Sequence, residues 1–154
     1  MSIKEYIGGQ FADPEGLGGL ACAKFMNIFN AEHYRAVKKF VCKLDGARIL
    51  DIGFGNGVTI KKLSKSINAK FYGVDISADM VEKAKRENRD GVNTNKVILQ
   101  QGKAEELPYN DDFFDTVYTV NTIYFWEDTA KVLDEVRRVL KDGGNFICTF
   151  YTKS

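Results

Sequence analysis

The chain has 154 residues, of which 44% are hydrophobic and 28% are charged, a composition typical of one globular domain rather than a disordered or membrane-spanning chain. Its 22 basic and 21 acidic residues nearly balance, so the charge gives no reason to expect nucleic acid as a partner. No apolar run approaches the length of a membrane span and the N-terminus lacks a signal-peptide pattern, which predicts neither a membrane partner nor secretion.

Residues that bind metals or form disulfides are few. The cysteines Cys22, Cys42 and Cys148 are scattered, no Cys-x-x-Cys pair occurs, and His33 is the only histidine. This set cannot complete a zinc site, and it predicts a reduced, cytoplasmic protein without metal or disulfides.

Residues 1–45 precede the predicted sheet. After a turn-rich start, helices are predicted over about 20–28 and 31–43, with Asn30 as the N-cap of the second. An apolar stripe runs along both, and one role for it is to pack on the sheet. Its members are Phe25, Ile28, Phe29, Tyr34, Val37, Phe40, Val41 and Leu44.

The segment Ile49–Gly57 is the strongest local signal in the sequence. A short apolar strand ends at Asp51 and breaks into a turn with glycine at positions 53, 55 and 57, and apolar residues at helical spacing follow. This is the layout of a nucleotide-binding βα unit, in which glycine lets a ligand approach the backbone and the helix N-terminus offers free N–H groups.

The glycine spacing indicates which ligand fits the turn. The dinucleotide fingerprint G-x-G-x-x-G would need glycine at position 58 or 60, where Val58 and Ile60 stand. A carboxylate at Asp51 would repel a pyrophosphate but would attract an ammonium group. The turn therefore favours a nucleoside that carries an amino group over one that carries phosphates.

Four more strands follow, separated by helical or loop segments. Strands are predicted over 70–74, 96–100, 114–120 and 145–151, and helices over 78–89 and 128–140. Ser77 is the expected N-cap of the first of these helices, and Gly143-Gly144 the expected end of the second.

Alternating strands and helices predict a parallel, doubly wound α/β sheet. Such sheets bind ligands beyond the carboxyl ends of their strands. Asp51, Asp75, Gly102 and Asn121 each stand at the end of a predicted strand, so we expect them at one edge of the sheet.

Four segments in this order resemble class I S-adenosylmethionine-dependent methyltransferases, in particular the small-molecule branch known as type 11. They are Asp51–Gly57, Gly73–Ser77, Gln101–Glu105 and Arg137–Gly144, and the likeness spans roughly residues 47–150. The resemblance implies a Rossmann-like sheet of order 3-2-1-4-5, S-adenosyl-L-methionine as cofactor, S-adenosyl-L-homocysteine as product and a small-molecule methyl acceptor. It further implies a cofactor-binding domain over residues 46–154 and a helical lid over residues 1–45.

The resemblance also implies roles for individual residues. Asp75 lies 18 positions after Gly57, close to the offset of about 20 at which an acid accepts from ribose hydroxyls, although it can also be a capping or surface acid. Asp51 is expected to hold the ammonium, directly or through water, and Ile76 to contact adenine. The expected cofactor-binding set is Asp51, Gly53, Gly55, Gly57, Asp75, Ile76, Met80 (for which the core is the alternative), Gly102, Lys103, Ala104, Glu105 and Asn121.

One position departs from the family pattern. Related sequences often have an acid where this chain has Lys103, and that acid accepts from the adenine amino group, whereas lysine has no acceptor. The Ala104 backbone N–H remains available to the adenine ring. Glu105 or a backbone carbonyl would have to accept from the amino group.

Three residues are candidates for the acceptor side. Tyr124 either lines the acceptor pocket or belongs to the core, and Trp126 is more typical of the core. His33 is a candidate general base, although a lone histidine in the first turn of a helix more often faces solvent or caps the helix. No obvious general base stands out, which fits a catalyst that works mainly by positioning.

The leading functional hypothesis is methyl transfer to a small molecule by in-line attack on the sulfonium methyl. The alternative is a catalytically weak or inactive cofactor-binding module with an interaction or regulatory role, and a nucleotide-dependent oxidoreductase is disfavoured by the glycine spacing. Related enzymes continue past the fifth strand with a further helix and two strands. We therefore expect a truncated chain whose fifth strand is an open edge that pairs with a second copy.

Overall fold

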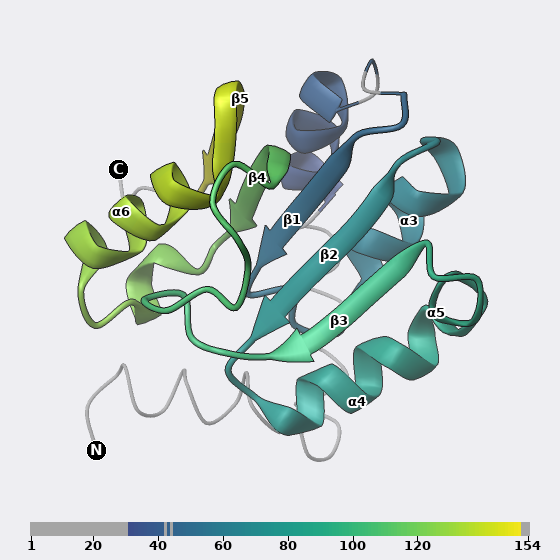
Figure 1. Cartoon of the computed structure of the whole chain (residues 1–154). Coiled ribbons are helices and arrows are strands. Elements are labelled where there is room, and N and C mark those ends of the chain that lie inside the picture. The colour runs from purple at the N-terminus through teal and green to yellow at the C-terminus, as the bar shows by residue number, and fades with distance from the viewer. Residues whose placement is uncertain (1–30, 42, 44, 152–154) are drawn as a thin grey trace. The chain divides into compact units, whose positions relative to one another are not determined.

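Figure 1 shows the computed structural model, which describes residues 31–41, 43 and 45–151. The chain divides into two units, Met1–Arg35 and Ala36–Ser154, and the second contains the sheet. Residues 31–41 form a helix, as predicted. The helix predicted over 20–28 and the N-cap predicted at Asn30 lie outside the described residues.

Five parallel strands form one sheet of order β3-β2-β1-β4-β5, which confirms the predicted α/β fold and strand order. They are β1 (Arg48–Ile52), β2 (Lys70–Asp75), β3 (Val97–Gln101), β4 (Phe114–Val120) and β5 (Leu140–Thr149). The strand order reverses between β1 and β4, and the carboxyl ends of the strands beside such a reversal are where open α/β sheets bind ligands.

The helices between the strands are α3 (Val58–Ser66), α4 (Ala78–Glu87), α5 (Arg89–Asn93) and α6 (Thr129–Val139), with a short 3-10 turn, η1 (Ile123–Phe125), after β4. In Figure 1, α3 and α4 lie on one face of the sheet and α6 lies on the other. The predicted cap at Ser77 is confirmed, because its Oγ accepts from the Met80 N–H at 3.3 Å. The helix predicted over 78–89 ends at Glu87, and α5 follows as a separate element.

The helix predicted over 128–140 is confirmed as α6, but the role predicted for Gly143-Gly144 is wrong. Gly143-Gly144 do not end the helix, because Leu140 is already extended and pairs with Phe114. The next pair in that ladder is Thr116 with Asn145, so residues 141–144 bulge out of β5. The cause is that the last helical carbonyls, those of residues 138 and 139, accept from the N–H groups of residues 112 and 113 just before β4. These two hydrogen bonds hold the end of α6 beside β4, so the chain enters β5 directly after the helix.

An apolar core fills the space between the sheet and α6. Val132, Val136 and Val139 of α6 are all buried, at the spacing of one helical face. They pack with Leu50, Ile52, Val74, Leu107, Phe114 and Val117. At about 25 cal/mol per Å² of apolar surface removed from water, this cluster is the main force that holds α6 to the strands.

Arg138 in α6 fixes the loop between β3 and β4. Its guanidinium donates to the backbone carbonyls of Leu107 (3.0 Å) and Tyr109 (2.8 Å) and to the carboxylates of Asp111 (2.8 Å) and Glu135 (2.7 and 2.8 Å). Glu135 Oε2 also accepts from the Leu107 N–H at 2.7 Å. Hydrogen bonds from Arg138 lower the pKa of Glu135, so the pair stays ionised.

We predict that Arg138→Lys lowers the free energy of unfolding by about 2 kcal/mol, because an ammonium keeps the charge but its three donors cannot serve two carbonyls and two carboxylates at once. Urea denaturation measures the change. Arg137→Lys on the exposed side of the same helix is the matched control and should stay within about 0.5 kcal/mol. Equal losses in the two variants would contradict this role of Arg138.

Candidate cofactor-binding site

The three glycines of the turn between β1 and α3 serve two purposes. All have positive φ: 76° at Gly53, 55° at Gly55 and 75° at Gly57. A Cβ at Gly53 would overlap the Thr122 side chain, and one at Gly57 would lie 2.7 Å from the Cβ of Ala84 in α4. At Gly55 a Cβ would meet nothing within 4 Å. Gly53 and Gly57 are therefore needed for packing, whereas Gly55 leaves open space beside the backbone of the turn.

Asp75, the last residue of β2, ties this turn to the sheet. Its Oδ2 accepts from the Gly55 N–H at 2.8 Å, and its Oδ1 accepts from the Ser77 N–H at 3.0 Å. A carboxylate has about four lone-pair sites, so each oxygen keeps the capacity to accept once more. Asp75 is half-buried and lies next to the open space at Gly55, where it can accept from two neighbouring hydroxyl groups of a ligand.

Asp51 lies in β1 beside Gly73 of β2 and Tyr118 of β4. It is 2% exposed, and its Oδ1 has no hydrogen-bond partner among the described residues. Burial raises the pKa of Asp51 to about 8, the Tyr118 hydroxyl lowers it in part, and the charge of Asp75 raises it. The carboxyl group is therefore mainly protonated at neutral pH, and a cation beside Oδ1 would favour its ionised form.

The residues expected to contact adenine lie beside the ribose acid. Ile76 directly follows Asp75, is 65% exposed, and has its backbone carbonyl held by the Gln101 side chain at 3.0 Å. An apolar side chain this exposed, next to a carboxylate, is available to a planar ring. Met80 is half-buried in the first turn of α4, so it does not belong to the fully buried core.

The segment from Gly102 to Glu105 begins at the carboxyl end of β3. The Gly102 N–H donates to the Asp75 carbonyl at 3.0 Å, which joins this segment to the ribose acid. Lys103 is exposed, and Ala104 packs against the core cluster under α6. Glu105 is expected to replace the missing acid at position 103. Its Oε1 already accepts from the Glu127 N–H at 3.0 Å, which leaves mainly Oε2 for a ligand.

Asn121 follows β4 and has an unusual backbone. Its φ is 56°, its N–H donates to the Thr149 carbonyl at 2.8 Å, and its Oδ1 is buried without a hydrogen-bond partner among the described residues. Positive φ is uncommon outside glycine, although asparagine tolerates it better than most residues. A second acceptor without a partner therefore stands at the same edge of the sheet as Asp51.

The candidates for the acceptor side are in different surroundings. Tyr124 in η1 is 52% exposed and its hydroxyl donates to the Tyr151 carbonyl, so it is not a core residue. Trp126 is half-buried against the core cluster, in line with the core role considered for it. His33 is 8% exposed rather than solvent-facing, and burial lowers its pKa while the charge of Glu32 raises it.

Three residues near the glycine turn escaped the sequence analysis. Tyr118 is fully buried beside Asp51, and Thr119 donates from Oγ1 to the Ile52 carbonyl at 2.8 Å and pairs with the Thr122 hydroxyl. In a sequence, Tyr118 and Thr119 are ordinary strand residues, and Thr122 is an ordinary residue of the loop that follows. Only the register between β1 and β4 shows that they hold the end of β1, so no local signal identifies them.

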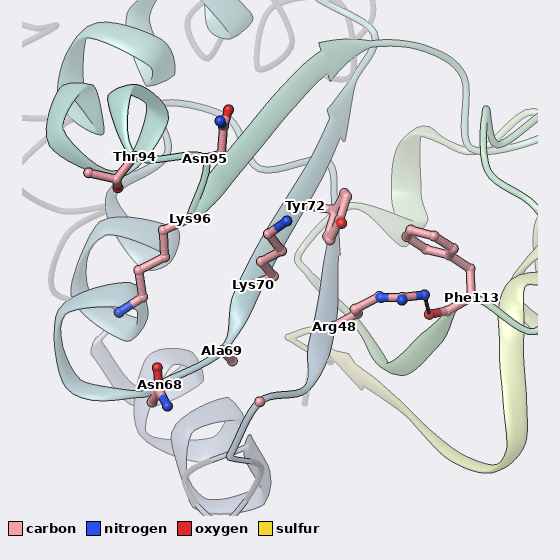
Figure 2. Close-up of a pocket in the computed structure, with 10 residues that line it drawn as sticks. Arg48, Asn68, Ala69, Lys70, Tyr72, Thr94, Asn95, Lys96 and Phe113 are labelled. Carbon is pink, nitrogen blue, oxygen red and sulfur yellow. Dashed lines mark hydrogen bonds between the residues drawn. The ribbon is translucent and has the colours of Figure 1, made fainter.

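A pocket of about 500 Å³ lies at the opposite, amino ends of the strands (Figure 2). Arg48, Lys70 and Tyr72 line it from β1 and β2, and Phe113 lines it from the loop before β4. The Arg48 guanidinium lies 4.4 Å from the centre of the Phe113 ring. None of the residues that the sequence predicts for the cofactor site lines this pocket.

One cation at this amino-terminal edge, Lys96, is explained by a helix that ends there. Lys96, which lines the same pocket, donates from Nζ to the Ser64 carbonyl in the last turn of α3. A cation complements the partial negative charge of a helix C-terminus. The charge of Lys96 therefore follows from the fold and does not by itself indicate a ligand.

No group of His, Cys, Asp and Glu side chains within the described part of the chain is arranged to hold a metal ion. None of the helices described in the structure is long and apolar enough to cross a membrane.

Residues 50–148 match the model of a protein family described as "Methyltransferase domain". The chain belongs to this family. It is 36% identical over 132 residues to the uncharacterized methyltransferase YcgJ of Bacillus subtilis, an alignment that covers 77% of this chain and 51% of YcgJ. It is also 32% identical over 126 residues to the ubiquinone/menaquinone biosynthesis C-methyltransferase UbiE of Vibrio vulnificus, covering 78% and 48%.

The methyltransferase fold is also found among solved structures. A protein from Methanococcus maripaludis, assigned as an S-adenosyl-L-methionine-dependent methyltransferase, superposes with a TM-score of 0.72 at 25% sequence identity, over 84% of this chain and 61% of that one. The chain spans about half the length of the two curated methyltransferases, YcgJ and UbiE. The family match and the solved structure therefore show that the chain has the fold of a methyltransferase and belongs to that class of protein.

We predict that Asp51 makes the cofactor-free protein less stable as pH rises from about 4 to about 8. In that window the folded protein keeps a proton on Asp51 that the unfolded chain has lost, so unfolding releases a proton and becomes easier at higher pH. The slope contributed is at most about 1.4 kcal/mol per pH unit, and it ends near pH 8.

Urea denaturation at several pH values should show that this component of the slope is absent from Asp51→Asn. Asp134→Asn, on the exposed surface of α6, is the control and should keep the wild-type slope. If Asp51→Asn and wild type had parallel profiles across this window, the carboxyl group would not carry the proton.

Proposed function

We propose that this chain binds S-adenosyl-L-methionine at the carboxyl ends of β1, β2 and β4 and transfers its methyl group to a small molecule. One observation carries the proposal: an open glycine turn stands between two carboxyl groups, Asp51 and Asp75, both with unused acceptor capacity. Such a site suits a ligand that carries hydroxyls and an ammonium, and it disfavours a pyrophosphate.

The residues present fit this cofactor. Asp75 would accept from the ribose hydroxyls with the lone pairs that Gly55 and Ser77 leave free. Asp51 and Asn121, whose Oδ1 atoms lack partners among the described residues, would accept from the ammonium. Because both atoms are shielded from solvent, the ammonium reaches them only through a bridging water or after a local movement.

The adenine would lie on the exposed Ile76 side chain, with Met80, Gly102, Lys103, Ala104 and Glu105 around it. The free oxygen of Glu105 or a backbone carbonyl would take the bond that Lys103 cannot accept.

Bound S-adenosyl-L-methionine supplies a methyl group that its sulfonium has already activated. The protein therefore has mainly to orient the acceptor in line and to exclude water. Tyr124 would line the acceptor side from η1. Most of the lid expected over residues 1–45 lies outside the described residues. UbiE, a relative of this chain, is named for quinone biosynthesis, which supports a small-molecule acceptor rather than a macromolecule.

A second candidate is a module that binds the cofactor without transferring its methyl group. One observation favours it: Lys103 stands where an acceptor is expected. Incubation with radiolabelled S-adenosylmethionine and a panel of phenols, quinols, amines and thiols separates the two. Product formation supports the enzyme, and stoichiometric binding without turnover supports the module.

We predict that Asp75→Ala weakens the binding of S-adenosylhomocysteine about 100-fold, because two hydrogen bonds to a charged acceptor are lost. Isothermal titration calorimetry measures the affinity, and Asp134→Ala should bind like wild type. Asp75 also accepts from two backbone N–H groups, so its loss can weaken the fold as well as the site. Thermal denaturation therefore checks that Asp75→Ala is folded, and the more conservative Asp75→Asn is measured beside it. Wild-type affinity in a folded Asp75→Ala variant would contradict the site.

We also predict that β5, at one edge of the sheet, pairs with a second copy of the chain. The apolar side chains of Phe150 (44%) and Tyr151 (39%), just beyond the strand, are exposed. Sedimentation velocity at micromolar concentration should show a dimer, and Phe150→Lys should shift it toward monomer. A single monomeric species for wild type would contradict this prediction.

A further inference from the structure

Tyr118 is the buried neighbour of Asp51. The two residues are register partners on adjacent parallel strands, so their side chains lie on the same face of the sheet. Tyr118 is 0% exposed and Asp51 is 2% exposed. The Tyr118 hydroxyl and Asp51 Oδ1 are both buried without a partner in hydrogen-bond geometry among the described residues. Two unsatisfied polar groups side by side in a core are costly, and each is what the other needs.

In a hydrogen bond between these two residues, Tyr118 is the donor and the Asp51 carboxylate is the acceptor. Burial and the nearby Asp51 raise the pKa of Tyr118 well above its ordinary value, so the phenol keeps its proton and acts as a donor. Asp51 becomes a pure acceptor only when it ionises. Among the described residues, the titratable groups that act on its carboxyl are Tyr118 from β4 and Asp75 from β2. Asp75 opposes ionisation, and Tyr118 supports it.

We propose that Tyr118 is a positioning residue whose hydroxyl donates to the Asp51 carboxylate when a cationic ligand ionises it, and so orients that carboxylate toward the cofactor's ammonium group. This inference rests on the proposed function and names a residue that holds the cofactor indirectly. Binding then converts the neutral carboxyl into a carboxylate, and its proton leaves to solvent. The carboxylate gains two partners, the ammonium and the phenol, so neither buried group is left unpaired.

The consequence is a pH-dependent affinity. Binding releases a proton from Asp51, so affinity for a ligand with an ammonium should rise with pH and level off near the pKa of Asp51, at about 8. Removing the phenol hydroxyl takes away a bond that favours the carboxylate. The plateau should therefore move to higher pH, and affinity at neutral pH should fall.

The test compares two ligands in wild type and in Tyr118→Phe, by isothermal titration calorimetry from pH 6 to 8.5. S-adenosylhomocysteine has the ammonium, whereas 5′-methylthioadenosine shares its nucleoside and thioether and lacks the amino acid part. Tyr118→Phe should bind S-adenosylhomocysteine about tenfold more weakly at pH 7, which corresponds to a shift of about one pKa unit. It should bind 5′-methylthioadenosine within about twofold of wild type, since that ligand makes no demand on Asp51.

Two further measurements keep the inference apart from a packing effect. In the cofactor-free protein, the pH-dependent loss of stability from Asp51 should continue to higher pH in Tyr118→Phe than in wild type. Tyr72→Phe is the matched control, because Tyr72 lies on the face of the sheet opposite to Asp51. It should change the binding of neither ligand.

The outcomes separate the two proposals. Equal weakening of both ligands, or an unchanged pH profile, would overturn the role of Tyr118 while leaving the cofactor site in place. Wild type that binds neither ligand would overturn the proposed function and this inference together.

Discussion

The Asp75 carboxylate makes the contact on which the candidate site depends. One side chain accepts from the Gly55 N–H in the turn after β1 and from the Ser77 N–H at the start of α4, and so links two βα units. Gly57 strengthens the same link, because its missing Cβ lets the turn lie directly on Ala84 of α4. A ligand that uses Asp75 therefore binds to a turn whose position is already set by the protein.

The buried Asp51 carboxyl group lowers the stability of the folded protein. A carboxyl group that is 2% exposed and short of a partner costs stability, and a leucine or valine at this point of β1 would pack without that cost. Its raised pKa keeps the group neutral until a cation arrives, which lowers the cost of burial in the meantime. Under the proposed function, this buried acid serves binding rather than folding.

The two ends of the sheet carry different sets of polar side chains. Acidic and acceptor groups stand at the carboxyl ends of β1, β2 and β4, beside the N-terminus of α3, whereas Arg48, Lys70 and Lys96 stand at the amino ends. Lys96 donates to a carbonyl in the last turn of α3, and Arg48 lies over Phe113. Parallel topology places helix C-termini at the amino ends of the strands, because every helix between two parallel strands runs against their direction.

The sequence by itself determined the order of strands and helices, the parallel sheet, the glycine turn and the placement of Asp51, Asp75, Gly102 and Asn121 at one edge. These follow from local periodicity, turn chemistry and the rule that parallel strands end together. Tertiary structure alone decided that Gly55 is open while Gly53 and Gly57 are packed, that Tyr118 lies against Asp51, and that α6 runs straight into β5. The reason is that each of these depends on contacts between residues far apart in the chain, which no local pattern encodes.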